Sequence, residues 1–476
     1  MEGAELSDLR TSVRGSVRTS VQELARYRGD QSPVEGSPCA VVAPTDAEDA
    51  ERLVRWARRH RIPLVARGGG SSLDGESAAR DGSVVADFSG WSRLLEVNTE
   101  ELWARVEPGL VNRDLQGRLR PHGLFFPPNP GSWTVATIGG NVGTNASGPR
   151  SFRYGPTRAW LREVEAVLGT GERVRFGTRV AKRSAGPELV ELFAGSEGTL
   201  GLATELTVRL APLPARREGL VVPLPRGGSL SAMARRLRSE RSTGLSAVEY
   251  IDRAAAAVLS EERALDWPSD APLLLLEIEA NDEGELRRHR EAVERALSAV
   301  GASHAPTVFS DADELWTLRG ASGVALDERM GRRVREDVAV PLGRIDDLVA
   351  RLEEIGREAP APFFLYGHLG EGSFHPNYAV PPGSPAAGTI RSKVLSAALD
   401  LGGTISAEHG IGVLKVDYLE RELGSVALDL LDAVKRRCDP DGILNPGKLY
   451  PYRVPRGDAG SSPSPSGSGG SRAPDG

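Results

Sequence analysis

Short apolar runs alternate with amphipathic segments from residue 40 onward. The run AVVA (40–43) is typical of a short buried strand, and residues 62–66 form a second such run. Between them, Thr45 with Glu48 three positions later is typical of a helix-capping box. The apolar face of the predicted helix consists of Leu53, Val54 and Ala57. A strand, a helix and a second strand in this order predict a parallel pair.

The same pattern continues to about residue 214 and then changes. Further strands are predicted at 84–88, 103–106, 161–168 and 201–210, with a glycine-rich stretch at 131–155. In the second half, helices are predicted at 230–237 and 283–300 and strands at 247–251 and 273–278, with an alanine-rich helix between the two strands. This irregular order predicts an α+β unit built on an antiparallel sheet.

Composition narrows the classes of protein that need to be considered. The 476 residues carry 65 acidic and 59 basic side chains, a net charge of −6 that argues against a nucleic-acid partner. No apolar run approaches the roughly 18 residues of a membrane span, and the first thirty residues contain no secretory signal. We therefore predict no integral membrane segment and a cytoplasmic location, with peripheral membrane attachment left open. Two distant cysteines, Cys39 and Cys438, provide neither a disulfide framework nor an iron–sulfur ligand set.

Three glycine-rich segments stand out in the first half. RGGGSSL (67–73) follows a predicted strand directly, and its backbone N–H groups and hydroxyls suit a phosphate, although a tight turn is the alternative. It is no dinucleotide-binding fingerprint, because the glycines follow the second strand instead of the first. The segments 130–148 and 194–201 are also rich in glycine, amide and hydroxyl groups, which suit a polar, planar ligand with a diphosphate.

The second half carries a histidine pattern. His368 and His375 stand seven residues apart, and Gly370 and Gly372 between them allow a sharp reversal that would aim both imidazoles at one place. Near the C-terminus, GGTISAEHGIG (402–412) adds a carboxylate and a further imidazole. Two imidazoles and a carboxylate suit Zn²⁺ or another divalent ion. The alternative is a set of hydrogen-bonded structural histidines in polar turns.

The motifs RGGGSSL, PGS…ATIGGNVGTNASG…RYG and AGSEGTLG, in this order, resemble the flavin-binding half of the vanillyl-alcohol-oxidase/PCMH superfamily over residues 37–214. The resemblance implies a two-subdomain α+β fold that binds FAD, with the pyrophosphate on Gly68–Ser72. The glycine loop contains neither His nor Cys, so non-covalent FAD is expected. The implied flavin-binding residues are Arg67, Gly68, Gly69, Gly70, Ser71, Ser72, Pro130, Gly131, Ser132, Thr137, Gly139, Gly140, Asn145, Gly148, Glu197, Gly198, Gly201, Leu202 and Asn445.

Residues 215–450, with YGHLGEGSFHPN, AEHGIG and a final NPGK, resemble the C-terminal domain of the FAD-linked D-2-hydroxyacid dehydrogenases. The resemblance implies His368, His375 and Glu408 as ligands of a divalent metal, with zinc as the first expectation. It implies His409 as the catalytic base and Asn377 near the substrate. The chain departs from the family pattern at Glu371, where Asp is usual, and at Ser373, where Asn is usual.

The segments LWTLR and REDVAVP resemble the family's substrate-carboxylate region, with Arg319 and Arg335 at the basic positions. A guanidinium binds a carboxylate through two parallel hydrogen bonds, which fits this role. The region is arginine-rich, however, and the alternatives Arg329, Arg332 and Arg333 are equally basic.

These resemblances imply an order of domains and a reaction. A helical segment (1–36) precedes the flavin domain (37–214) and an α+β cap domain with an antiparallel sheet (215–450), and a Gly/Ser/Pro-rich tail (451–476) is expected to be disordered. The implied reaction oxidises glycolate, D-lactate or D-2-hydroxyglutarate by hydride transfer to flavin N5. Electrons would pass to a cytochrome, an electron-transfer flavoprotein, a quinone or an iron–sulfur subunit. An alkylglycerone-phosphate-synthase-like transferase and a flavin-binding subunit of a larger oxidase remain alternatives.

Overall fold

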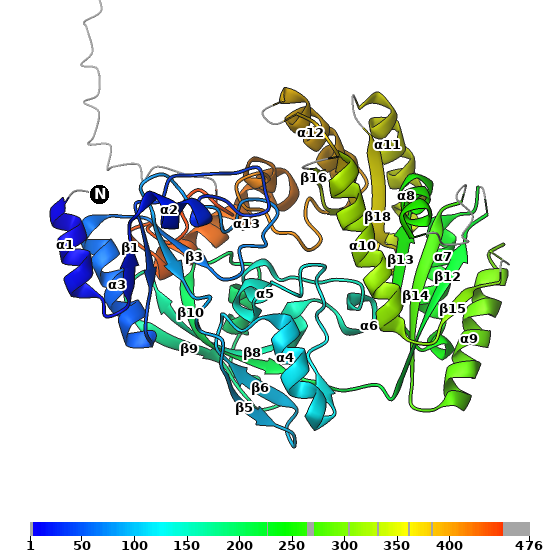
Figure 1. The fold of residues 1–476 in the computed structure, drawn as a ribbon, viewed down its shortest axis with the longest axis horizontal. Helices are drawn as coiled ribbons and strands as arrows, with labels where there is room; N and C mark the ends of the chain where they lie inside the picture. The colour runs from blue at the N-terminus through cyan, green and yellow to red at the C-terminus, as the bar shows by residue number, and fades with distance from the viewer. Residues whose placement is uncertain are drawn as a thin grey trace, which may run out of the picture.

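The computed structural model describes residues 3–225, 227–263, 271–302, 305–330, 333–359, 362–381 and 384–450. The predicted disordered tail (451–476) lies outside these residues. Two lobes stand side by side, the first drawn in blue to teal and the second in green to yellow (Figure 1). Between residues 3 and 36, the chain forms helix α1 (Gly3–Ser12), strand β1 (Ser16–Arg18) and the short helix α2 (Val21–Leu24).

The first lobe begins with a four-stranded sheet in the order β1-β2-β4-β3. Strands β2 (Ala40–Ala43) and β3 (Leu64–Arg67) flank β4 (Val84–Asp87), and each of them pairs with β4 in parallel. The predicted strands are therefore parallel, but they are not neighbours, because β4 inserts between them. Helix α3 (Ala47–His60) connects β2 to β3 and buries Leu53, Val54 and Ala57 as predicted.

The start of α3 differs from the prediction. The N-cap is Asp46 instead of Thr45, and its carboxylate accepts a hydrogen bond from the Asp49 N–H at 2.9 Å. A carboxylate interacts more favourably than a hydroxyl with the positive end of the helix dipole. Thr45 lies one residue earlier, where its N–H donates to the buried Asp49 carboxylate at 3.0 Å.

A second subdomain of the first lobe is a five-stranded antiparallel sheet in the order β5-β6-β10-β8-β9. Helix α4 (Asn112–Leu119) packs against it, and the predicted glycine-rich stretch includes two short helices, α5 (Ile138–Thr144) and α6 (Ser151–Tyr154). Two short strands, β7 (Leu124–Phe125) and β11 (Ala211–Pro212), pair separately. The five strands are β5 (Leu94–Asn98), β6 (Trp103–Val106), β10 (Gly201–Arg209), β8 (Leu161–Leu168) and β9 (Arg173–Gly177).

The second lobe is built on an eight-stranded sheet, and within the described residues its neighbouring strands pair in antiparallel fashion, as the sequence predicted. Its order is β15-β12-β14-β13-β18-β19-β16, and β17 pairs with β19. The strands are β12 (Arg216–Pro223), β13 (Leu245–Ile251), β14 (Leu273–Ala280), β15 (Thr307–Phe309), β16 (Val334–Arg335), β17 (Val338–Ala339), β18 (Phe363–His368) and β19 (Ser373–Tyr378).

Helices cover both faces of this sheet, which explains the continuous apolar run of β14. Leu274 and Leu276 pack in the core formed with helices α7 (Leu230–Ser239), α9 (Glu283–Ser298), α11 (Ile345–Glu358) and α12 (Pro385–Asp400). Leu273 and Leu275 point to the opposite face, in the core formed with α8 (Arg253–Arg263) and α10 (Ala312–Met330). Successive strand residues alternate between faces, so both faces must be apolar when both are covered.

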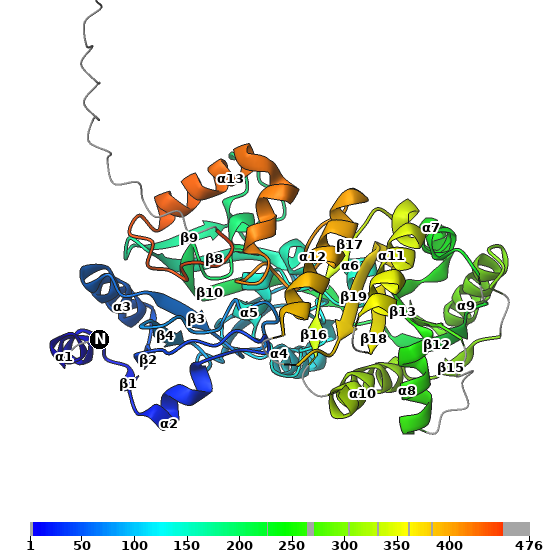
Figure 2. The same ribbon diagram turned by 90° about the horizontal axis from the view of Figure 1, so that it is seen from above.

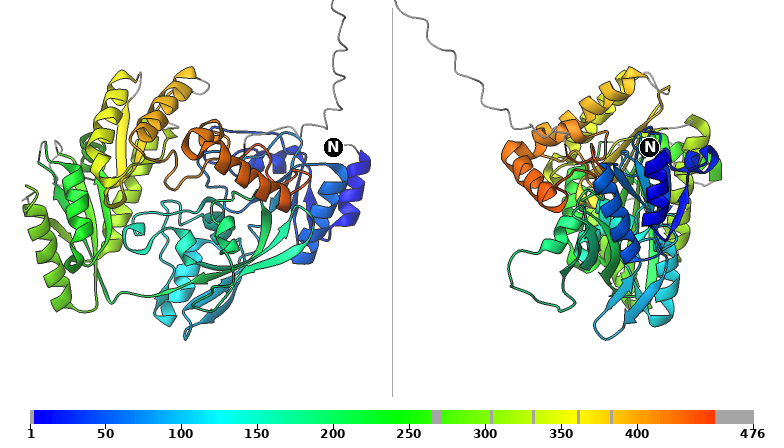
Figure 3. Two further views of the ribbon diagram at one scale, coloured as in Figure 1. Left: turned by 180° about the vertical axis from the view of Figure 1, so that it is seen from behind. Right: turned by 90° about the vertical axis from the view of Figure 1, so that its left-hand side faces the viewer.

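The last part of the chain returns to the first lobe. Helix α13 (Leu419–Cys438), drawn in orange, lies beside β8 and β9 (Figures 2 and 3). Its Lys435 Nζ donates to the Thr199 carbonyl at 2.7 Å, and Leu444 forms a parallel bridge with Leu64. Residues 439–450 thus complete the first lobe in space although they follow the second lobe in sequence. In the described part of the chain, no helix is long and apolar enough to cross a membrane.

A buried ion pair fastens this returning segment to the first lobe. The Lys415 Nζ lies 3.0 Å from Asp74 Oδ2, and the two side chains are 0% and 1% exposed. Burial raises the pKa of Asp74 to about 7, and the neighbouring ammonium opposes that shift. The Lys415 ammonium therefore offsets part of the cost of burying the charged form of Asp74.

We expect Lys415→Met to lower the free energy of unfolding by about 3–5 kcal/mol, because it leaves a buried carboxylate without its counter-charge. Urea denaturation followed by fluorescence measures the effect. The double variant Lys415→Met/Asp74→Asn should recover part of the loss, since it removes both charges. Equal stability of Lys415→Met and the parent would contradict this role.

Candidate functional site

A cavity of about 700 Å³ opens between the two lobes, within the size range of cofactor and ligand sites. The first lobe contributes its three glycine-rich segments and the second contributes its histidines and arginines. The predicted site residues that line the cavity are Arg67, Gly68, Gly69, Gly70, Ser71, Ser72, Pro130, Gly131, Ser132, Thr137, Gly139, Gly140, Glu197, Gly198, Gly201, Arg319, Arg335, His368, His375, Asn377, Glu408 and His409.

The glycine loop after β3 is packed against the second glycine-rich segment so closely that side chains do not fit. A Cβ at Gly68 would lie 2.2 Å from Thr137 Oγ1, and a Cβ at Gly69 would lie 2.1 Å from the Val135 carbonyl oxygen. Gly70 has a φ of +65°, which L-residues rarely adopt. The two segments therefore form one cradle of exposed backbone, as a bound diphosphate requires.

Four predicted flavin-binding residues do not line the cavity. Asn145 ends α5 with a φ of +55°, and Leu202 is a core residue of β10. Gly148 has a φ of +124°, and a Cβ there would lie 2.3 Å from the Asn129 carbonyl oxygen. These three residues shape the backbone behind the cradle instead of facing the cavity.

Asn445 is the fourth. Its side-chain amide donates to the carbonyls of Glu76 and Glu197 at 2.9 and 2.6 Å, and its backbone N–H donates to Leu64. It is buried with a φ of +43°. Asn445 therefore joins the C-terminal segment to the walls of the cradle.

The two predicted histidine ligands lie on neighbouring strands of one hairpin. Tyr366 on β18 faces His375 on β19, and the turn between the strands has Gly372 at a φ of +76°. Residues two apart on a strand point to the same face, so His368 and His375 share a face with Tyr366 and Asn377. The sharp reversal that the glycines predicted is the turn of this hairpin.

The three predicted metal ligands converge. Glu408 Oε1 lies 3.1 Å from His368 Nε2 and 3.4 Å from His375 Nε2. One ligand atom from each residue lies within 4.8 Å of the other two. Glu408 Oε2 is buried without a hydrogen-bond partner among the described residues. Two ring nitrogens and a carboxylate with a spare oxygen fit a divalent ion such as zinc.

The protonation of the histidines follows from their surroundings. Burial lowers the pKa of His375 to about 3 and that of His409 to about 4, so both rings are neutral at pH 7. Burial acts in the same direction on His368, but the carboxylates of Glu249 and Glu408 outweigh it and raise the pKa of this ring. Glu249 contacts His368 Nδ1 and leaves Nε2 toward Glu408.

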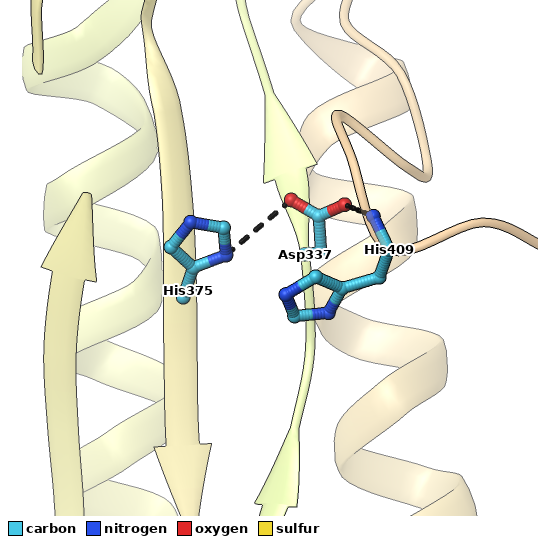
Figure 4. A group of neighbouring side chains, drawn as sticks. All are labelled: Asp337, His375 and His409. Carbon is cyan, nitrogen blue, oxygen red and sulfur yellow. Dashed lines mark hydrogen bonds and ion pairs between the residues drawn. The ribbon is translucent and has the colours of Figure 1, made fainter. Parts of the chain in front are cut away.

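The structure adds an aspartate that the prediction did not assign to the site. Asp337 Oδ1 lies 3.4 Å from His375 Nδ1, and the His375 and His409 rings stack with centroids 5.0 Å apart (Figure 4). Asp337 Oδ2 accepts from the backbone N–H groups of residues 407, 408 and 409 at 2.8, 2.7 and 2.9 Å. Asp337 lies within the REDVAVP segment, but sequence alone gave no reason to relate it to histidines 38 and 72 residues later.

The same loop is held from the first lobe by Glu197. Its carboxylate accepts from the N–H groups of Ile411 and Gly412 at 2.7 and 3.0 Å. Burial raises the pKa of Glu197 to about 7, and these two hydrogen bonds oppose the shift. Glu197 therefore lines the predicted flavin cavity and also positions the loop that carries Glu408 and His409.

Three arginines line the second-lobe side of the cavity. The Arg319 guanidinium lies 4.9 Å from the centre of the Tyr366 ring and 3.7 Å from Glu249. Arg335, on β16, also lines the cavity. Arg333, which the sequence did not distinguish, lines it too and donates to Asn377 Oδ1 at 3.0 Å. The side chains of Arg329 and Arg332 lie outside the described residues.

The two departures from the family pattern have different surroundings. Glu371 contacts the Ser151 hydroxyl of α6, so its longer side chain bridges to the first lobe instead of joining the histidine cluster. Ser373 lies opposite His368 in the hairpin, and its buried hydroxyl has no hydrogen-bond partner among the described residues.

Two family models match the chain: an FAD binding domain at residues 38–177, and the C-terminal domain of FAD linked oxidases at residues 213–449. Glycolate oxidase subunit GlcD of Bacillus subtilis is 31% identical over 89% of this chain and 92% of that protein. D-2-hydroxyglutarate dehydrogenase of Stutzerimonas stutzeri is 31% identical over 94% and 99%. D-lactate dehydrogenase of Archaeoglobus fulgidus is 33% identical over 89% and 95%.

Solved structures share the fold at lower identity. A substrate-bound p-cresol methylhydroxylase superposes with a TM-score of 0.79 at 17% identity, covering 95% of this chain and 98% of that one. An alkyldihydroxyacetonephosphate synthase superposes with a TM-score of 0.71 at 18% identity, covering 94% and 85%. These structures confirm the α+β fold, and the matched family models identify its first lobe as a PCMH-type flavin-binding domain.

The fold, the glycine cradle and the matched models define an FAD-linked oxidoreductase. Within that class, the chain belongs to the FAD-linked D-2-hydroxyacid dehydrogenase family, as its motifs indicated.

We expect Gly69→Ala to weaken FAD binding by roughly tenfold or more, a change of ~1.4 kcal/mol or more in binding free energy. The added Cβ would collide with the Val135 carbonyl, so the two walls of the cradle would have to separate. The FAD content after gel filtration and the visible spectrum measure the effect. Gly117→Ala on α4 is the control, since a Cβ there meets open space. Parental FAD content in Gly69→Ala would contradict this assignment.

Proposed function

We propose that this protein oxidises a D-2-hydroxy acid to the 2-oxo acid with non-covalently bound FAD and a divalent metal ion. The supporting observation is that His368, His375, Glu408 and His409 face the same cavity as the glycine cradle. A flavin-binding module without catalysis would not need this cluster.

The cradle residues would hold FAD, which supplies the acceptor for the two electrons and hydrogen that leave the α-carbon. Its closely packed backbone suits the diphosphate, and the predicted pyrophosphate position is Gly68–Ser72. The cavity lining includes no cysteine among the described residues, and its histidines belong to the second-lobe cluster. Both features support a dissociable flavin.

His368, His375 and Glu408 would hold the metal, with Zn²⁺ as the first candidate. Such an ion, when bound, acidifies the substrate's α-hydroxyl. The neutral His375 ring is ready to offer a nitrogen, whereas His368 must release a proton because metal binding requires the neutral ring.

His409 would accept the hydroxyl proton. Its ring is neutral at pH 7 and therefore in the form that a base requires. Its Nδ1 has no hydrogen-bond partner among the described residues. Once the proton has moved, the buried negative charge of Asp337 stabilises the resulting imidazolium, since this carboxylate opposes the lowering of the His409 pKa.

The arginine side of the cavity would bind the substrate carboxylate. Arg319 and Arg335 are the predicted residues, and Asn377, which accepts a hydrogen bond from Arg333, lines the same cavity. The named relatives act on glycolate, D-lactate and D-2-hydroxyglutarate, which define the substrates to compare.

An external acceptor would receive the electrons. A relative from Arabidopsis thaliana is named D-lactate dehydrogenase [cytochrome], which makes a cytochrome one candidate beside an electron-transfer flavoprotein, a quinone or an iron–sulfur subunit. The likeness to a synthase concerns the fold alone and does not favour a transferase.

The purified protein should be yellow, release FAD on denaturation and reduce an artificial dye with at least one of glycolate, D-lactate or D-2-hydroxyglutarate. Exhaustive chelation should remove most activity and leave the flavin spectrum intact, because the metal ligands and the cradle lie in different lobes. A colourless protein that FAD cannot reconstitute would contradict the proposal. Full activity in metal-free protein would eliminate its metal part.

His409→Ala and Glu408→Ala should lose activity for different reasons. Loss of a general base lowers rates by roughly 10²–10⁴, so His409→Ala should lose that much kcat while it retains metal and FAD. Glu408→Ala should lose metal. Elemental analysis and single-turnover flavin reduction measure both effects. Flavin reduction at the parental rate in His409→Ala would place the base elsewhere.

A further inference from the structure

We infer that Asp337 is a positioning residue for the metal site, which orients His375 through its ring and Glu408 through its backbone. The inference rests on the metal site of the proposed function and adds a residue that the family resemblance did not supply. Asp337 is fully buried and reaches two of the three ligands from one carboxylate.

The two carboxylate oxygens of Asp337 contact different groups. Oδ2 accepts three consecutive backbone N–H groups, which include that of Glu408 at 2.7 Å. Oδ1 faces His375 Nδ1 at 3.4 Å (Figure 4). No strand or helix pairs these three N–H groups, so the carboxylate sets the direction of the loop on which Glu408 is carried.

Oδ1 also selects the tautomer of His375. A neutral imidazole carries one proton, and a carboxylate beside Nδ1 favours the proton on that nitrogen. The Nε2 lone pair is then directed toward Glu408, 3.4 Å away, where an ion would bind. The opposite tautomer would direct a proton at that position.

The other metal-site histidine has a similar arrangement, in which the carboxylate lies close enough to form a hydrogen bond with the ring. His368 also contacts a buried carboxylate through Nδ1, that of Glu249, and faces Glu408 through Nε2. Each ring thus lies between an outer carboxylate and the common Glu408. Carboxylates that hold the far nitrogen of a ligand histidine orient the ring and raise its basicity.

Asp337, His375 and His409 also have ligand atoms close enough to hold an ion themselves. Simultaneous occupation of both positions would require His375 to coordinate through both nitrogens and lose its last ring proton. Asp337 Oδ2 is already committed to three N–H groups. We therefore assign this group to the support of one metal position, and metal stoichiometry distinguishes the two cases.

The test is Asp337→Asn in the FAD-loaded full-length protein, stripped of metal and titrated with Zn²⁺ against a chromophoric chelator. The amide keeps an oxygen for the backbone N–H groups but presents an N–H₂ donor to His375 Nδ1. We expect Zn²⁺ affinity to fall about 10–100-fold, as is typical when a ligand histidine loses the carboxylate that holds its other ring nitrogen. FAD content and the visible spectrum should not change.

Glu422→Gln is the matched control. The Glu422 carboxylate accepts from Thr404 Oγ1 and from the Ile405 N–H, both at 2.8 Å, so it holds the same loop without touching a histidine. If loop anchoring in general determined metal affinity, both variants would weaken it. We expect parental Zn²⁺ affinity in Glu422→Gln, with thermal denaturation recording the stability cost of each variant.

Parental Zn²⁺ affinity in Asp337→Asn, or equal weakening in Glu422→Gln, would overturn this inference and leave the proposed function intact. So would two Zn²⁺ per parental chain and one per Asp337→Asn chain, because Asp337 would then be a ligand. A parental chain that binds no Zn²⁺ would overturn the metal part of the proposed function and this inference together.

Discussion

The site depends on the hydrogen bonds that fix the backbone of residues 407–412. Five N–H groups of this segment bond to two buried carboxylates, three to Asp337 and two to Glu197. A buried N–H group without a partner destabilises a protein by roughly 1–3 kcal/mol, so the two carboxylates largely determine the path of the loop. Asp337 belongs to the second lobe and Glu197 to the first. The loop that carries Glu408 and His409 therefore requires both lobes in place.

Other buried charges also join segments that are far apart in sequence. Asp74 with Lys415 and Arg150 with Glu277 are further pairs between segments far apart in sequence. Ser151 and Glu371 add a contact between α6 and the histidine hairpin. Charged groups at such depth are tolerated only with partners, so each pair specifies one relative placement of its segments. The proposed reaction, which requires a flavin beside a metal-bound substrate, would depend on this placement.

Several features followed from local rules. The strand and helix periods of residues 40–66 and the tight hairpin between the histidines depend on near neighbours in the chain, and the structure contains them. The antiparallel sheet of the second half followed from the irregular order of its predicted elements, although its strands pair across long stretches of sequence. Asp46 as the cap of α3 was missed because two adjacent polar residues satisfy the same local pattern. The helices α5 and α6 were missed because glycine-rich composition disfavours helix. Helix α5 is stabilised by packing in the first-lobe core and by the cap at Thr137, whose Oγ1 accepts a hydrogen bond from the Gly140 N–H, whereas α6 packs against β13 of the second lobe.

By itself, the sequence determined the class of the protein, the position of the glycine cradle and the convergence of His368 and His375, because ordered motifs and hairpin spacing are properties of one segment at a time. Only the tertiary structure decided that Arg333 lines the cavity, that Asn445 and Leu202 lie behind it, and that Asp337 supports the histidines. These assignments depend on which of several equivalent charged or polar residues are brought together by distant segments. For Arg333 and Asp337 burial then decides the role, because a charge removed from water has to interact with the groups that the fold places beside it.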